Sequence, residues 1–251
     1  MRIIAVAMTK GGVGKTTTAV NLSHGLSLRG HRVLLVDADT QGQCARALGV
    51  AAELTLTEVL TGEATVLDAV YRARDGLDLI ASDHQLTRAA LAIARREHDG
   101  HRVLAEALDP IRDRYDEVIL DAAPGVDAVA VNVLACADDV LAPVMLSPAA
   151  LAGVFDFVRH VERVGKHAQQ VCLRWVLPTF HDLRTRQSAD ALLQLRENFG
   201  DLVCQPIRVN VDLSVAFGWQ QTIFEHAPAS RGAADYAALV ETVRSRAPAP
   251  A

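Results

Sequence analysis

The chain has 251 residues, 50% of them hydrophobic, and a formal net charge of −5. This size and composition allow one domain with a substantial core, and the weak negative charge provides no overall attraction to nucleic acid or membranes. The apolar run at the N-terminus is too short for a secretory signal, and no apolar stretch is long enough to span a bilayer. We therefore expect a cytoplasmic protein.

The four cysteines, Cys44, Cys136, Cys172 and Cys204, are not spaced as CxxC pairs. This spacing disfavours a disulfide framework and a zinc site. We expect the cysteines to be small core residues.

A glycine-rich segment, KGGVGKTT at residues 10–17, separates two apolar patterns. Residues 3–8 are typical of a buried strand, and the apolar spacing of residues 19–26 is typical of a helix. Strand, glycine-rich turn and helix in this order predict a phosphate cradle, in which backbone N–H groups and the positive end of the helix dipole face phosphate oxygens. The cradle consists of Lys10, Gly11, Gly12, Val13, Gly14, Lys15, Thr16 and Thr17.

Two side chains of this cradle have predicted roles. Lys15 would reach the β- and γ-phosphates, and the Thr16 hydroxyl would coordinate Mg²⁺. Thr9 stands where the general GxxxxGK[ST] pattern has Gly, and Lys10 is a second lysine. The alternative is a turn that only joins a strand to a helix, which three glycines followed by Lys and Thr disfavour.

The next apolar run, residues 32–36, leads into Asp37 and Asp39. Acidic residues at the carboxyl end of a parallel strand lie where α/β sheets bind ligands. A carboxylate there can hold Mg²⁺ through water or orient an attacking water. Either aspartate alone could cap a helix, but two of them in a chain with a phosphate cradle favour a functional role.

The segment from residue 51 to residue 114 contains patterns without recognisable chemistry. We expect short helices at 56–60 and 66–71, a strand at 77–81, and helices at 86–97 and 101–114. The apolar run at residues 117–121 then ends in Asp121 and matches a Walker B strand, whose carboxylate supports Mg²⁺ through a coordinated water. Gly125 could offer a backbone N–H near the γ-phosphate.

The remaining elements continue the alternation of strands and helices. Their expected ranges are 129–135, 148–164, 185–199, 213–219 and 232–246 for helices, and 139–144, 173–177 and 202–207 for strands. This alternation predicts an α/β fold with a mainly parallel, doubly wound sheet flanked by helices. We expect a single P-loop NTPase domain at residues 1–246 and a short flexible tail at residues 247–251.

Taken together, these motifs resemble the ParA/MinD family of ATPases over nearly the whole chain. The segment at residues 10–17 resembles the deviant Walker A motif of that family. Residues 37–42 (DADTQG) resemble its switch I, and residues 121–124 (DAAP) resemble its switch II. Residues 177–182 (LPTFHD) and 230–233 (SRGA) extend the resemblance towards the C-terminus.

The resemblance implies an ATP-dependent homodimer with Mg²⁺, in which Lys10 reaches the nucleotide of the partner subunit. Water would attack the γ-phosphate in line. The implied catalytic residues are Lys10, Lys15 and Asp39, and the implied metal ligands are Thr16, Asp39 and Asp121. Pro178 and Asn210 are expected to contact the nucleotide beside the cradle. A solvated turn lysine is the alternative role of Lys10.

Two members of the family differ in what they act on. A ParA-type partitioning ATPase would bind nonspecific DNA on the nucleoid, and a ParB-like centromere-binding protein would stimulate its hydrolysis. A MinD-like positioning ATPase would act on a membrane or a protein assembly. The final residues, RAPAPA, are not an amphipathic membrane helix, which argues against a membrane target.

The candidate DNA contacts are basic residues in the second half of the chain. They are Arg184, Arg186, Arg208 and Arg231. For each of them, a solvated or ion-paired surface position is the alternative. Asp212 stands where many ParA proteins have a second basic residue. The iron–sulfur reductase branch of the superfamily is excluded, because it needs a cysteine just after switch II and residues 122–135 contain none.

Overall fold

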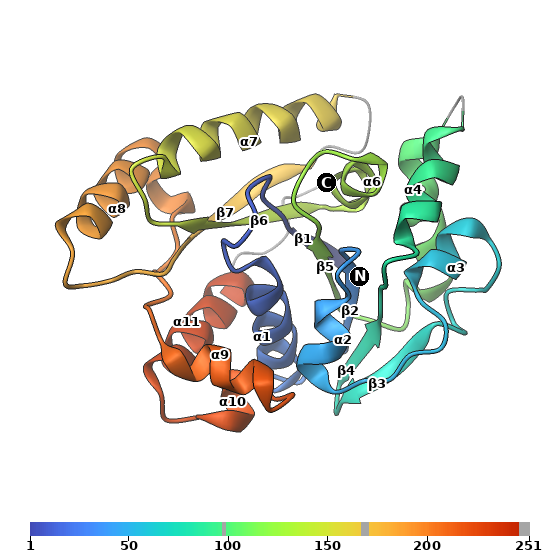
Figure 1. The fold of residues 1–251 in the computed structure, drawn as a ribbon, viewed down its shortest axis with the longest axis horizontal. Helices are drawn as coiled ribbons and strands as arrows, with labels where there is room; N and C mark the ends of the chain where they lie inside the picture. The colour runs from blue at the N-terminus through green and yellow to red at the C-terminus, as the bar shows by residue number, and fades with distance from the viewer. Residues whose placement is uncertain (97–98, 167–170, 246–251) are drawn as a thin grey trace.

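The computed structural model describes residues 1–96, 99–166 and 171–245. Within these ranges the chain forms one sheet with a layer of helices on each face (Figure 1). The tail expected at residues 247–251 lies outside the described residues.

The sheet confirms the predicted mainly parallel architecture. The described residues form seven strands in the order β3-β4-β2-β5-β1-β6-β7, and only β3 runs antiparallel to its neighbour. The strands are β1 Arg2–Val6, β2 Val33–Ala38, β3 Val70–Arg74, β4 Leu77–Ile80, β5 Glu117–Ala122, β6 Asp139–Met145 and β7 Cys172–Thr179. The central strands are continuous apolar runs because both of their faces are covered by helices.

The helices separate into two layers. One layer packs on the face that contains Ile4 and Leu35, and it consists of α1 Lys15–Ser27, α2 Gln43–Leu48, α9 Val211–Gly218, α10 Ile223–His226 and α11 Arg231–Ser245. The other packs on the face that contains Ala5 and Leu120, and it consists of α3 Leu56–Thr61, α4 Leu86–Ala94, α5 Val103–Leu108, α6 Ala128–Cys136, α7 Ala150–Gly165 and α8 Arg186–Phe199. In the part of the chain that the structure describes, three short 3₁₀ segments accompany them, η1 Gly100–Arg102, η2 Asp109–Ile111 and η3 Gly200–Leu202.

The strand register brings the ends of three central strands to one place. Asp121, near the end of β5, pairs with Val6 at the end of β1 and with Asp37 near the end of β2. Because these strands are parallel, the loops that follow them leave the sheet at the same edge. The glycine-rich loop after β1 therefore lies beside the acidic ends of β2 and β5.

The predicted helix at residues 66–71 is wrong. Residues 66–69 form turns, and β3 begins at Val70 and pairs antiparallel with β4. Val66 and Ala69 are nevertheless buried in the core, which explains why their spacing suggested a helix. Apolar residues at helical spacing can thus be buried from turns, without forming a helix.

Prolines contribute to two further differences. The single helix expected at residues 101–114 is divided into η1, α5 and η2. Pro110 lies in η2 and accounts for the end of α5 at Leu108, but not for the division between η1 and α5. The strand expected at residues 202–207 is reduced to isolated bridges formed by Val203 and Arg208. Pro206 lies between these bridges, and a proline has no N–H to extend a ladder.

Three of the four cysteines are core residues as expected, and Cys172 is exposed. No helix among the described residues is both long and apolar enough to cross a membrane.

A buried ion pair anchors the opposite edge of the sheet and gives a test of the packing. Asp139 is 1% exposed and accepts hydrogen bonds from Arg2 at 2.7 and 2.9 Å and from Arg174 at 2.8 Å. Asp139→Ala should lower the free energy of unfolding by about 3–5 kcal/mol, because it leaves a buried guanidinium without its partner. Asp156→Ala, which removes an exposed partner of Arg159 on α7, should cost less than about 1 kcal/mol in the same urea titration. Equal losses for the two variants would contradict this assignment.

Candidate functional site

The glycine-rich loop between β1 and α1 has the backbone of a ligand cradle. Gly12 and Gly14 have φ of 71° and 89°, in the left-handed region that favours glycine. A Cβ atom added at Gly11 or Gly12 would meet nothing within 4 Å, so this side of the loop faces open space. The Val13 carbonyl accepts a hydrogen bond of 2.9 Å from Thr179 Oγ1, which ties the loop to the end of β7.

The two lysines of the loop lie in different surroundings. Lys15 is 7% exposed and its Nζ donates to the Lys10 carbonyl at 3.1 Å. Burial lowers the pKa of Lys15, and the charges of Asp121 and Asp39 oppose this effect. The side chain of Lys10 is exposed to solvent. The loop therefore presents one cation inside the cradle and one at its outer surface.

Two buried carboxylates lie beneath the cradle. Asp37 and Asp121 are 0% and 1% exposed. The carboxylate of Asp37 accepts hydrogen bonds from the backbone N–H groups of Asp39 at 3.0 Å and Cys44 at 2.9 Å. Burial raises the pKa of Asp121, and the adjacent Asp37 charge raises it further, while hydrogen bonding by the Thr16 hydroxyl lowers it.

The residues expected at a metal site fit Mg²⁺. Asp121 Oδ1 is buried and has no hydrogen-bond partner among the described residues, and a buried carboxylate oxygen is costly without one. Thr16 and Asp121 contribute hydroxyl and carboxylate oxygens, which are the ligands Mg²⁺ prefers. A hard divalent cation bound at this position would satisfy the oxygen that the protein leaves unpaired.

Asp39 is the first residue of the loop after β2. It is half-buried, and its Oδ1 accepts a hydrogen bond of 3.0 Å from the backbone N–H of Gln41. Asp39 and Pro124 line a cavity of about 260 Å³, so the loops after β2 and β5 face each other there. This position suits a carboxylate that orients a small molecule such as water.

A larger cavity of about 520 Å³ adjoins the cradle. Its wall combines the start of α1, the segment after β7, and α9. The residues that line it are Gly14, Thr17, Gln43, Thr179, Phe180, Ile207, Arg208, Val209, Asn210, Val211, Leu213, Ser214, Phe217 and Tyr236. A mainly apolar cavity with a few polar groups next to a phosphate cradle suits a nucleotide base.

Asn210 and Pro178, the two residues expected to contact the nucleotide beside the cradle, lie in different surroundings. Asn210 lines the cavity, and its side chain accepts a hydrogen bond of 2.8 Å from the Asp212 N–H at the start of α9. Pro178 is buried in β7, and the residues after it, Thr179 and Phe180, form the wall. Phe180 has φ of 54°, a strained conformation for a bulky residue that is common at ligand sites.

Several wall residues could not be found by sequence reasoning. Phe180, Phe217 and Tyr236 come from three distant segments. Phe180 lies in the segment at residues 177–182 that carries part of the family resemblance, but no contact with a ligand was expected of it, and Phe217 and Tyr236 belong to no motif. Phe217 lies in a helix that we did expect, but its apolar character gave no indication of a ligand.

The four arginines proposed as DNA contacts fall into two groups. Arg184 and Arg208 are paired within the chain, with Asp182 at 2.8 Å and with Asp235 at 2.6 Å. Arg186 and Arg231 are exposed at the first residues of α8 and α11. Internal pairing neutralises part of the positive charge that a phosphate backbone would need.

The helix α9, which forms one wall of the large cavity, is weakly packed. Only Ala216 of its residues is buried, and a small cavity of about 50 Å³ lies between α9 and the helices α1 and α2. The position of this wall must therefore depend on contacts at the ends of the helix. Asn210 provides one of them, because its side chain packs so closely against α11 that a Cβ added at Gly232 would lie 2.9 Å from its Nδ2.

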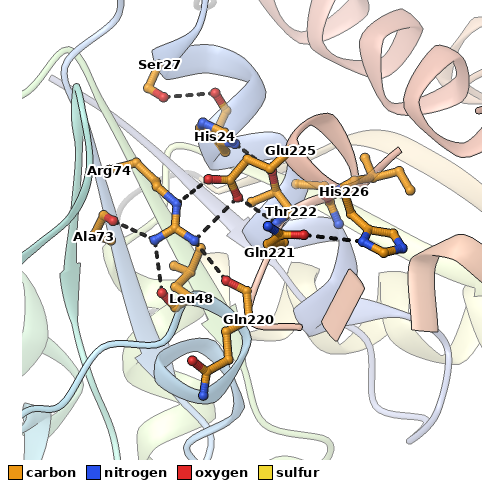
Figure 2. A network of polar contacts seen from close by, with 12 residues as sticks. His24, Ser27, Leu48, Ala73, Arg74, Gln220, Gln221, Thr222, Glu225 and His226 are labelled. Carbon is orange, nitrogen blue, oxygen red and sulfur yellow. Dashed lines mark hydrogen bonds and ion pairs between the residues drawn. The ribbon is translucent and has the colours of Figure 1, made fainter. Parts of the chain in front are cut away.

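Arg74 provides the contact at the other end of α9 (Figure 2). From the edge strand β3 it donates hydrogen bonds of 2.9 Å to the carbonyl of Gln220, just after α9, and of 2.9 Å to the carbonyl of Leu48, at the end of α2. Its Nε also donates to Glu225 Oε1 at 2.5 Å. One guanidinium thus holds together the ends of α2 and α9 and the short helix α10.

The same network continues to the helix that follows the cradle (Figure 2). Glu225 Oε2 accepts a hydrogen bond of 2.8 Å from the Thr222 N–H. The Thr222 hydroxyl shares a hydrogen bond of 2.6 Å with Nδ1 of His24 on α1. The wall of the cavity and the cradle helix are therefore connected through side chains as well as through packing.

The chain is similar to known proteins over nearly its whole length. A family model described as "AAA domain" matches residues 1–172. The chain is 36% identical to the chromosome partitioning protein ParA of Caulobacter vibrioides over 98% of its length and 95% of the relative. It is 39% identical to the chromosome-partitioning ATPase Soj of Thermus thermophilus, over 98% of the chain and 96% of the relative.

Solved structures share the fold over nearly the full length. Cobyrinic acid a,c-diamide synthase from Mycobacterium smegmatis, with a bound ATP analogue and magnesium, is 30% identical with a TM-score of 0.83, covering 97% of this chain and 94% of that one. McdA from Cyanothece in complex with ATP is 25% identical with a TM-score of 0.86, covering 100% and 99%.

The Arg74 network gives a prediction for nucleotide binding. Arg74→Ala should weaken the binding of a fluorescent adenine nucleotide about tenfold, equivalent to about 1.4 kcal/mol, because α9 loses the contact that holds its C-terminal end. Arg72→Ala is the matched control on the same strand, where the side chain pairs with Asp78 instead. Wild-type affinity in Arg74→Ala, or an equal loss in Arg72→Ala, would contradict the role of Arg74.

Proposed function

Because the chain belongs to the ParA/MinD family of ATPases, we propose that it is an ATP-dependent homodimer that drives the partitioning of DNA in the cytoplasm, on the nucleoid. Its ATP-bound dimer binds DNA without sequence preference, and a ParB-like centromere-binding protein stimulates hydrolysis. The observation that carries this proposal is the strand register, which brings the phosphate cradle after β1 next to the carboxylates that follow β2 and β5.

In this proposal the cradle holds the phosphates of ATP, and the large cavity holds the base. Backbone N–H groups of the loop from Gly11 to Gly14, together with the start of α1, face the phosphate oxygens. Thr16, Asp39 and Asp121 would hold Mg²⁺, with Asp39 acting through a coordinated water, and the ion would supply positive charge that neutralises developing charge on the phosphates. Asn210 and the residues after Pro178 position the base.

Hydrolysis requires a group that orients water and groups that stabilise negative charge. Asp39 has the first role, since its carboxylate is only half-buried and lines a cavity open to small molecules. Lys15 has the second role within the subunit. A buried ammonium beside the phosphates is effective because little water screens it.

Lys10 completes the site of a second subunit. Its side chain is exposed at the surface of the loop, where it is available to a partner chain. A cation supplied in trans to the transferred phosphoryl group is worth about 10³–10⁵ in rate in related phosphoryl-transfer enzymes. ATP-dependent dimerisation and hydrolysis would then be coupled through one residue.

The partitioning role is supported by relatives named as chromosome-partitioning proteins that cover almost the whole chain. Arg186 and Arg231 are the exposed candidates for phosphate contacts, and dimerisation doubles their number. Arg184 and Arg208 would have to leave their carboxylate partners to take part.

A second candidate function is the positioning of a protein assembly. The observation that favours it is the surface of α9 and the residue that follows it, where Val211 and Trp219 are 72% and 70% exposed. Asp212 adds a negative charge in the same segment. An apolar surface fits a protein better than it fits a phosphate backbone.

Asp39→Ala tests the proposed mechanism. This variant should bind ATP and dimerise like the parent, while its hydrolysis rate falls by at least about 10², because no carboxylate orients the water. Phosphate release and size-exclusion chromatography with ATP measure the two properties. Asp75→Ala, in the exposed turn between β3 and β4, is the control. Hydrolysis at the parental rate in Asp39→Ala would show that another residue orients the water.

Binding to nonspecific duplex DNA separates the two candidate functions. A partitioning ATPase should bind with ATP and not with ADP, and its affinity should fall steeply as salt increases. The double variant Arg186→Ala/Arg231→Ala should reduce the salt dependence, whereas Arg159→Ala should not. Fluorescence anisotropy across a salt series measures this. Absence of binding with either nucleotide would favour the protein-positioning function.

A further inference from the structure

We propose that Asp37, Cys44 and Asp121 form a second binding mode of the metal site, which accepts a thiophilic divalent cation such as Zn²⁺ or Cd²⁺ in competition with Mg²⁺. Candidate oxygen, sulfur and oxygen ligands of these three residues all lie within 4.8 Å of one another. The effect on hydrolysis rests on the function proposed above, whereas the binding itself does not.

The local backbone explains why a cysteine lies beside these carboxylates. Gly42, with φ of 57°, passes so close to the loop after β4 that an added Cβ would lie 2.4 Å from the Ser82 carbonyl oxygen. This close approach fixes the start of α2, and Cys44 follows as a fully buried residue of its first turn. The Cys44 N–H donates to Asp37 Oδ2 at 2.9 Å.

The thiol points at the Walker B carboxylate. Cys44 Sγ donates to Asp121 Oδ2 at 3.4 Å, whereas Asp121 Oδ1 is buried and has no partner among the described residues. The cluster therefore contains a carboxylate oxygen that the protein does not satisfy and a thiol that can become an anionic ligand. A cation between them would satisfy both.

The cysteine sulfur determines which cations this cluster binds more tightly. Mg²⁺ takes oxygen ligands and gains nothing from sulfur, whereas Zn²⁺ and Cd²⁺ bind thiolate strongly. On binding, the S–H bond of Cys44 breaks, its proton leaves to solvent, and the sulfur lone pair forms the bond to the metal. Two carboxylate oxygens and one thiolate leave a position for water, as at zinc sites with three protein ligands.

The consequence is an inhibited state of the ATPase. Asp121 cannot support Mg²⁺ while it ligates another cation, and Asp37 is drawn towards the same ion. Hydrolysis in Mg²⁺ should therefore fall when a small amount of Zn²⁺ is added, and a chelator should restore it. The cysteine would make the enzyme sensitive to thiophilic metals.

Cadmium titration of the full chain tests the site directly. The exposed Cys172 would also bind this metal, so all proteins carry Cys172→Ser. Without nucleotide, Cd²⁺ should produce the ultraviolet absorption of a cadmium–thiolate bond at one equivalent per chain. The Cys44→Ala variant should lose this absorption, and Cys136→Ala, which removes another buried thiol, should keep it. No absorption in the parent, or absorption that survives Cys44→Ala, would overturn the proposal.

A second measurement separates this proposal from the proposed function. Phosphate release in Mg²⁺ should be inhibited by Zn²⁺ in the parent and in Cys136→Ala, but not in Cys44→Ala when each is compared with its own rate without Zn²⁺. Equal inhibition of all three proteins would overturn the regulatory role. Cys44-dependent cadmium absorption in a chain that hydrolyses no ATP under any condition would support the metal site and contradict the proposed function.

Discussion

The pairing of β1, β2 and β5 is the constraint on which the site depends. It places two carboxylates, Asp37 and Asp121, side by side at the edge where the glycine-rich loop leaves the sheet. Both are removed from water, which makes their charge costly. Lys15 is the nearby cation that partly compensates the charge of Asp121. A phosphate-bound divalent cation is the natural complement of such a site.

Much of this site could be predicted because its parts are local in sequence. The cradle, the acids of switch I and Asp121 each follow an apolar strand, and parallel strands bring their carboxyl ends together. In the wall of the large cavity, Asn210 was expected to contact the nucleotide. The aromatic residues of the wall, Phe180, Phe217 and Tyr236, could not be predicted, since they meet only in the folded chain. The same holds for Arg74, whose partners Gln220 and Glu225 are 146 and 151 residues away.

The differences between predicted and observed secondary structure also fall into two groups, those explained by local sequence and those that depend on contacts between distant segments. Pro110 and Pro206 are visible in the sequence, and their missing N–H groups account for the end of α5 and for the lost strand. The helix α10 also has a recognisable beginning, because Thr222 and Glu225 form a capping box. By contrast, the antiparallel edge strand β3 depends on pairing with β4, and its sequence alone resembled the end of a helix. Local sequence signals therefore predicted where helices and strands end better than they predicted which strands pair.

The weak packing of α9 also has a dynamic consequence. A helix with one buried side chain loses little apolar contact when it opens, so its free energy of local unfolding lies well below that of the sheet. Backbone amides of α9 should therefore exchange with deuterium through a separate, low-energy opening. A nucleotide base against this wall would suppress that opening. Binding of a nucleotide would then make the outer, apolar side of α9 more ordered without changing its average conformation.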